Sequence, residues 1–155
     1  MRGDIVLFLG LVTVIGGGII VAAVLLFGGG GGGTVSPCDD PLVAIGESEI
    51  SQMGFQAQDA GLARLIQAAQ AGDLDEANAA LYGNDGAVHN FTHNIDPSLR
   101  EVDEKLAIEL CEAVIEMEEE LVIGQRLSVI AGQATRLREL IQDAAEALGY
   151  ARPGG

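Results

Sequence analysis

Both histidines of the chain lie four residues apart in the segment GAVHNFTHNIDP, residues 86–97. On a helix this spacing places His89 and His93 on one face, the arrangement that HExxH zinc proteins use. The three residues between them, NFT, include no glutamate. The general base of that motif is therefore missing, and the pattern excludes metalloprotease chemistry.

Nearby carboxylates extend this pair to a possible metal site. Asp85, Asp96 or Glu101 would complete a Zn²⁺ or Cu²⁺ site, because imidazole and carboxylate together suit borderline cations. The alternative is structural: the histidines pin a short turn-helix by hydrogen bonds, with Phe91 as a buried anchor. A C-x-x-C-H haem attachment motif is absent from the sequence. We expect no cofactor, with a divalent metal at the two histidines as the alternative.

Composition and charge set the fold class and exclude one class of partner. The 155 residues carry a formal net charge of -15, which repels nucleic acid. There is no tryptophan, and alanine, leucine, isoleucine and glutamate are abundant, which favours helices over sheet. We therefore expect an all-α protein that has no nucleic-acid partner. No motif indicates a reaction, so we expect no enzyme activity.

A long apolar segment precedes a run of glycines. Residues 5–27 contain no charged residue, which at helical rise is long enough to cross a lipid bilayer. The six glycines at 28–33 disfavour a helix and predict a flexible tether. The expected parts are a cytoplasmic N-terminus (1–4), a transmembrane helix (5–27), a Gly-rich tether with a juxtamembrane segment (28–46), a helical bundle (47–150) and a flexible tail (151–155).

Basic residues near the apolar segment predict its orientation. Arg2 precedes the segment, and the next basic residue is the distant Arg64. By the positive-inside rule the N-terminus is cytoplasmic and the bundle is extracytoplasmic, on the periplasmic or extracellular side. In that compartment Cys38 and Cys111 would form a disulfide that pins the juxtamembrane segment to a core helix. The alternative is a free Cys111 that packs as a small apolar residue.

Two shorter helices are predicted in the first half of the bundle. The first runs from Ser48 to Gly72. The second occupies DLDEANAALY, with Asp73 as its N-cap, and stops at Gly83. The apolar face expected for the first helix consists of Ile50, Met53, Ala57, Leu62, Leu65, Ile66 and Ala69.

The largest predicted element begins at Asp96-Pro97, where aspartate is the expected N-cap and proline the first helical residue. Gly124 interrupts it without a turn signal, so we expect one long helix, the alternative being a helix pair hinged at IGQ, 123–125. The acidic run at 116–120 is expected to be a solvated helix face. The predicted packing seam is Leu99, Val102, Leu106, Leu110, Val114, Met117 and Leu121, followed by Leu127, Ile130, Ala134, Leu137, Ile141, Ala144 and Leu148.

Two stretches of this region show a family resemblance. AAQAGDLDEANAALY and IDPSLREVDEKLAIELCEAVIEMEEEL together cover about half of the chain. They resemble the extracytoplasmic helical-bundle domains of imelysin-like and iron-permease-associated proteins. The resemblance implies metal binding by histidines or glutamates, which here corresponds to His89, His93 and the acidic run at 116–120. The multi-span permease of the latter proteins is missing from this sequence.

Small residues in the apolar segment indicate a helix partner. Thr13 with Gly17, and Gly18 with Ala22, are spaced so that another transmembrane helix can approach closely. The expected function is a non-enzymatic, single-pass accessory subunit that presents its bundle to a membrane protein complex. One alternative is an anchored domain that captures or delivers Zn, Cu or Fe. A third is a pilin-like filament subunit, indicated by RGD before an apolar helix.

The orientation is directly testable. A reporter that is active only outside the cytoplasm, fused after Gly155, should be active, because Arg2 holds the preceding end inside. The matched fusion to a reporter active only in the cytoplasm should be silent. The reverse pattern would contradict both the orientation and the expectation of an oxidising compartment for the cysteines.

Overall fold

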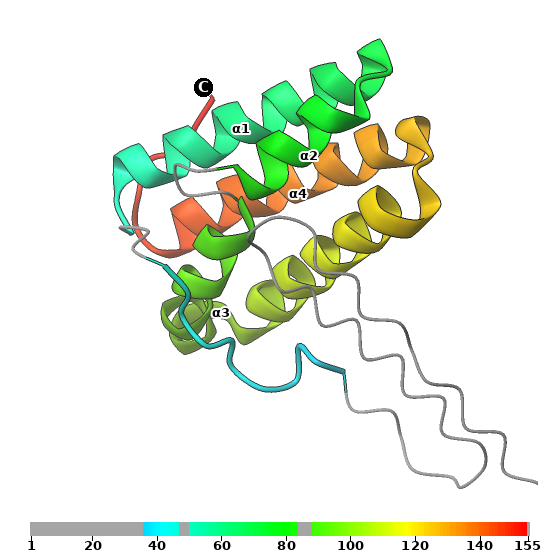
Figure 1. Ribbon diagram of the computed structural model, residues 1–155. Helices are drawn as coiled ribbons and strands as arrows, with labels where there is room; N and C mark the ends of the chain where they lie inside the picture. The colour runs from blue at the N-terminus through cyan, green and yellow to red at the C-terminus, as the bar shows by residue number, and fades with distance from the viewer. Residues whose placement is uncertain (1–35, 47–49, 84–87, 155) are drawn as a thin grey trace, which may run out of the picture. The chain divides into compact units, whose positions relative to one another are not determined.

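The computed structural model describes residues 36–46, 50–83 and 88–154, all of which belong to one compact unit of the chain (Figure 1). The described part is all-helical and contains no strand, which confirms the expected fold class and the helical bundle. Its elements are α1 (Gln52–Ala71), α2 (Leu74–Tyr82), α3 (Val88–Glu119), the π-helical turn η1 (Glu120–Gly124) and α4 (Leu127–Ala147).

Several predictions concern residues outside the described part. These are the transmembrane helix at 5–27, the glycine tether, and the carboxylate of Asp85. The expected helix-packing positions also lie there, namely Thr13, Gly17, Gly18 and Ala22. Within the described residues, no helix is both long enough and apolar enough to span a bilayer.

The first two helices begin and end at capping residues. The Ser51 hydroxyl accepts a hydrogen bond from the Gly54 amide at 3.1 Å and so caps α1. The helix therefore begins at Gln52 and not at Ser48. Gly72, at φ 84°, ends α1 in the left-handed conformation that glycine adopts without strain. Asp73 accepts from the Glu76 amide at 2.9 Å and starts α2 as the sequence predicts.

The buried face of α1 differs from the predicted one at its start. Met53, which the periodicity assigns to the core, is 77% exposed, and Ala57 is exposed as well. Phe55 is fully buried instead, and its ring meets Phe91 edge-on at a centroid distance of 5.0 Å. Burial of the Phe55 ring thus determines which face of α1 is turned towards the core. Further along the helix, Leu62 is buried as predicted.

The start of α3 contradicts the predicted cap at Asp96-Pro97. The helix begins at Val88, and Pro97 lies inside it. Asp96 is 2% exposed, and its carboxylate does not cap a helix but accepts hydrogen bonds from the Leu42 amide and from Arg100, one turn further along α3. The break comes later, at Asp103, whose backbone is non-helical (φ -152°, ψ 85°) and whose side chain accepts from the Leu106 amide at 3.0 Å.

The expected single long helix is also wrong, and the alternative helix pair is present. The chain leaves α3 through η1, takes a left-handed conformation at Gln125 (φ 51°), and is extended at Arg126 before α4 begins. Gly124 contributes a steric reason, since a Cβ atom there would come within 2.3 Å of a Glu120 carboxylate oxygen. A larger residue would have to displace the Glu120 side chain, which is hydrogen-bonded to Arg126.

This reversal allows α4 to pack along α1 and against α3 (Figure 1). The shared core contains apolar residues from all four α-helices, and Leu65, Leu81, Leu110 and Leu137 are examples that are almost fully buried. Val102, which the predicted seam places inside, is exposed because the break at Asp103 changes the helical register. The seam of α4 is buried at Ile130, Leu137 and Ile141 as predicted.

A buried ion pair joins α1 to α4. Asp59 is 5% exposed, and its carboxylate accepts from Arg138 Nε at 2.7 Å and Nη2 at 2.8 Å. Gln142 Nε2 donates to the same carboxylate at 2.7 Å. These hydrogen bonds, the one from Arg138 above all, hold the pKa of Asp59 below its ordinary value of 3.8.

The chain after α4 is held against this region, although the sequence predicts a flexible tail at 151–155. Ala151 exchanges two hydrogen bonds with the Gln52 side chain, at 2.8 and 3.0 Å. Arg152 pairs with Asp143 and Glu146, and Pro153 is buried. Residues 151–154 are thus part of the bundle.

Replacing the buried carboxylate tests the link between α1 and α4. Asp59→Asn should lower the free energy of unfolding by about 2 kcal/mol at pH 7, because it weakens charge-assisted hydrogen bonds in a buried site. A lowered pKa in the folded state means that this contribution is present above 3.8 and is lost as the pH falls through the folded value. The difference between wild type and variant should therefore shrink towards pH 2–3, as measured by chemical denaturation.

The exposed Glu139 on α4 provides the control, since Glu139→Gln removes one negative charge without touching the pair. Glu139→Gln should leave the free energy of unfolding nearly unchanged both at pH 7 and at low pH. If Asp59→Asn lowered the free energy of unfolding by the same amount at low pH as at pH 7, the effect could not be assigned to the ion pair.

Candidate functional site

Residues 36–46, here called the strap, are fastened to α3 by a covalent bond near their start. Cys38 and Cys111 are 73 positions apart in sequence and form a disulfide with Cα atoms 5.8 Å apart. Both sulfur atoms lie in the interior, since Cys38 is 0% and Cys111 2% exposed. The sequence allowed either a disulfide or a free Cys111. The structure contains the disulfide.

Polar side chains of α3 hold the rest of the strap. Asp96 Oδ2 accepts from the Leu42 amide at 2.8 Å and from Arg100 Nε at 2.9 Å. Arg100 in turn donates to the carbonyl oxygens of Cys38, at 2.6 Å, and Asp40, at 3.1 Å. The strap has no secondary structure of its own, so these bonds satisfy backbone groups that would otherwise lose their hydrogen bonds. This use of Oδ2 explains why Asp96 does not cap a helix, whereas Asp96 Oδ1 is buried and has no hydrogen-bond partner among the described residues.

The two histidines lie side by side on the first part of α3, with ring centroids 4.8 Å apart. Their Nδ1 atoms have different partners. His89 Nδ1 contacts a carboxylate oxygen of Glu118, and His93 Nδ1 lies 2.9 Å from the Val43 carbonyl oxygen of the strap. The hydrogen bond between His93 and the strap, and the burial of Phe91, agree with the predicted structural role of this segment.

A small cavity of about 190 Å³ adjoins both rings, and Glu118 and Cys111 also line it. The Tyr82 ring lies next to His89, with the two ring centroids 5.8 Å apart. Partial burial, with a smaller contribution from the nearby Glu118 carboxylate, raises the pKa of the Tyr82 phenol above its ordinary value. The phenol therefore stays protonated and neutral at physiological pH.

The predicted third metal ligands are not brought together with the histidines. Asp96 is engaged by the strap and Arg100, Glu101 is exposed on the outer face of α3, and Asp85 lies outside the described residues. Among the residues that the structure describes, no group of three or more His, Cys, Asp or Glu side chains is arranged to hold a metal ion. The carboxylate that does meet a histidine is Glu118, which the sequence assigned only to an acidic run.

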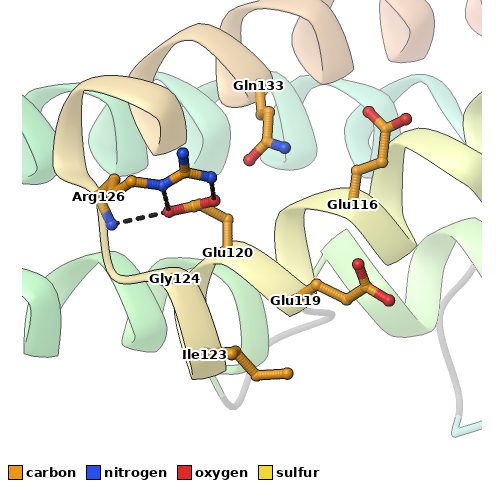
Figure 2. Close-up of a pocket in the computed structure, with 7 residues that line it drawn as sticks. All are labelled: Glu116, Glu119, Glu120, Ile123, Gly124, Arg126 and Gln133. Atoms are coloured by element: carbon orange, nitrogen blue, oxygen red, sulfur yellow. Dashed lines mark hydrogen bonds and ion pairs between the residues drawn. The ribbon is translucent and has the colours of Figure 1, made fainter.

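The acidic run at 116–120 is not uniformly solvated. Met117 is fully buried and Glu120 is 6% exposed, whereas Glu116 and Glu119 are exposed as predicted. Figure 2 shows Glu120 facing Arg126 across the turn between α3 and α4. The backbone amide and Nε of Arg126 donate to Glu120 Oε1 at 2.8 and 2.9 Å, and Nη2 donates to Oε2 at 2.5 Å.

This ion pair forms one wall of a second cavity, here called the hinge pocket. It has a volume of about 330 Å³ and is lined by Glu116, Glu119, Glu120, Ile123, Gly124, Arg126 and Gln133 (Figure 2). The hydrogen bonds from Arg126 hold the pKa of Glu120 below its ordinary value of 4.5, so Glu120 is ionised at neutral pH. Gln133 Oε1 is buried and receives no hydrogen bond from any described residue.

Exposed apolar side chains lie at the same turn. Ile123 is 77% exposed and lines the hinge pocket, and its neighbour Val122 is 47% exposed. Val122 and Ile123 are adjacent, so together they form a small apolar patch rimmed by carboxylates. The sequence pattern could not reveal this surface, because a continuous helix would have placed these residues in regular helical positions.

No protein-family model, curated protein or solved structure matches the chain in the comparisons made with each. The resemblance to imelysin-like and iron-permease-associated domains therefore stays a prediction.

Removal of the disulfide tests how firmly the strap stabilises the domain. The Cys38→Ser, Cys111→Ala double variant should lower the free energy of unfolding by about 4 kcal/mol, because the cross-link closes a long loop in the unfolded chain. The measurement is chemical denaturation of full-length protein in detergent.

Reduction supplies the control for this variant. A reducing agent should destabilise the wild type by a similar amount and leave the double variant unchanged. Equal stability of the oxidised wild type and the double variant would show that the strap is held by its hydrogen bonds alone.

Proposed function

We propose that this protein is a non-enzymatic accessory subunit, anchored by a single transmembrane helix at 5–27, that presents an acidic extracytoplasmic bundle to a larger membrane protein complex. The anchor rests on the 23 consecutive uncharged residues of that segment. The small-residue pairs Thr13/Gly17 and Gly18/Ala22 are proposed to contact a transmembrane helix of the partner.

The disulfide supports the extracytoplasmic location of the bundle. Disulfides persist in oxidising compartments and are rare in the cytosol of most organisms. Here the bond joins Cys38, shortly after the glycine run, to the second half of α3. A protein with this bond is suited to the periplasm or the cell exterior, in agreement with the orientation expected from Arg2.

The observation that carries the proposed partner contact is Ile123, 77% exposed beside an acidic pocket. The partner that fits this surface is a basic protein segment. A lysine or arginine side chain would enter the hinge pocket opposite Glu116 and Glu119, and apolar side chains would cover Ile123 and Val122. The net charge of -15 over the whole chain favours association with a positively charged surface.

The hinge pocket also offers selectivity for a cationic side chain. The Glu120 carboxylate is already neutralised by Arg126, whereas Glu119 has no ion pair with a described residue and Glu116 has only a long one, 3.5 Å from Arg136. The unpartnered Gln133 Oε1 adds a hydrogen-bond acceptor. The carboxylates of Glu116 and Glu119 and the Gln133 oxygen thus provide acceptors that suit a guanidinium or ammonium group.

A pull-down tests this proposal with a matched pair of variants. Tagged full-length protein should retain a defined set of membrane proteins in a gentle detergent. Ile123→Ser should weaken that retention by about tenfold, because truncating a central apolar contact typically costs more than 1 kcal/mol. Retention should also fall as salt is raised, since charge attraction contributes.

Met53→Ser is the control, because Met53 is equally exposed at 77% but lies on α1, away from the hinge pocket. It should leave retention unchanged. Purification of the wild type without any membrane protein, or equal retention by wild type and Ile123→Ser, would contradict the proposed contact.

A further inference from the structure

The Nδ1 atoms of His89 and His93 both face acceptors, and this fixes the tautomer of each ring. Glu118 offers a carboxylate oxygen to His89, and Val43 offers its carbonyl oxygen to His93 at 2.9 Å. An acceptor opposite Nδ1 places the proton on Nδ1 and leaves a lone pair on Nε2. No described residue makes a hydrogen bond to Nε2 of either ring.

Metal-binding histidines in proteins show this same arrangement. The nitrogen that does not bind the metal donates its proton to a carboxylate or a backbone carbonyl, which fixes the ring and raises the basicity of the other nitrogen. Both acceptor types occur here, one for each ring. In this arrangement Nε2 is the ring nitrogen left for a metal, and Nε2 of each ring here has no hydrogen bond with a described residue.

The ring separation is compatible with a shared ion. With an Nε2–metal bond of about 2.1 Å, an ion lies about 3.2 Å from each ring centroid, and bond angles from about 90° to 109° then separate the centroids by about 4.5 to 5.2 Å. The observed separation of 4.8 Å falls within that interval. The adjoining cavity of about 190 Å³ leaves room for further ligands such as water.

We propose that His89 and His93 bind one divalent transition-metal ion through their Nε2 atoms, with Glu118 and the Val43 carbonyl as the groups that orient the two rings. The site is independent of the proposed partner contact at the hinge pocket. Because no described cluster supplies a third protein ligand, the remaining positions are open to water or to a ligand from outside the described residues. Imidazole ligands and an open coordination sphere favour Cu²⁺ over other first-row divalent ions.

Cu²⁺ itself is a suitable probe. Full-length protein in detergent, first stripped with a chelator, should bind one equivalent of Cu²⁺ in a calorimetric titration. Electron paramagnetic resonance of the loaded protein should show coupling to two imidazole nitrogens. Both cysteines are in the disulfide, so no thiolate competes for the ion.

Variants separate the ligands from the orienting group. His89→Ala and His93→Ala should each abolish the two-nitrogen signal. Glu118→Ala should weaken binding by about 10- to 100-fold, the usual effect of removing a group that orients a metal-binding histidine. Glu118→Gln keeps an acceptor opposite Nδ1 and should restore much of the affinity. Glu112→Ala, on an exposed position of the same helix, removes an equal charge and should change nothing.

Three outcomes would overturn the proposal. These are no Cu²⁺ binding by the wild type, a spectrum without imidazole coupling, and equal binding by the wild type and the His89→Ala, His93→Ala double variant. The spectrum of the wild type decides the question even if a histidine variant fails to fold. Thermal unfolding in metal-free buffer identifies any such variant beforehand.

Discussion

The reversal of the chain between α3 and α4 is the constraint on which the rest of the fold depends. Within it the Glu120 carboxylate accepts hydrogen bonds from the backbone amide and guanidinium of Arg126, and a side chain at Gly124 would collide with that carboxylate. Only after this reversal can α4 lie against α1, where the Asp59–Arg138 pair and a large part of the shared core form. The same turn creates the hinge pocket and exposes Ile123.

Local signals in the sequence were sufficient for much of the fold. Capping at Asp73 and glycine at 72 set the limits of α2 and the end of α1, and helical periodicity identified the buried face of α4. Failure occurred where a distant residue competes for a local signal. Asp96-Pro97 has the form of a helix start, but strap residue Leu42, 54 positions away, takes the Asp96 carboxylate. The break at Gly124 depends on a local contact instead, because it follows from the position of the Glu120 side chain four residues earlier.

The candidate site shows the same division between local and long-range information. Spacing alone predicted that His89 and His93 share a helix face, and the structure places their rings side by side. Their partners could not be predicted, because Glu118 is 29 positions from His89 and Val43 is 50 positions from His93. Both contacts require tertiary structure: the strap must lie on α3, and α3 must bend at Asp103.

The disulfide also determines how the domain would respond to mechanical load. A pulling force applied to the chain before Cys38 passes through the covalent bond to Cys111, so the segment between the two cysteines is bypassed. Helices α1 and α2 lie wholly inside that bypassed loop. If the load is borne by a partner held at Ile123, the stressed path within the bundle is only the end of α3 and the turn after it. Most of the hydrophobic core would then remain unstressed while the protein is under tension.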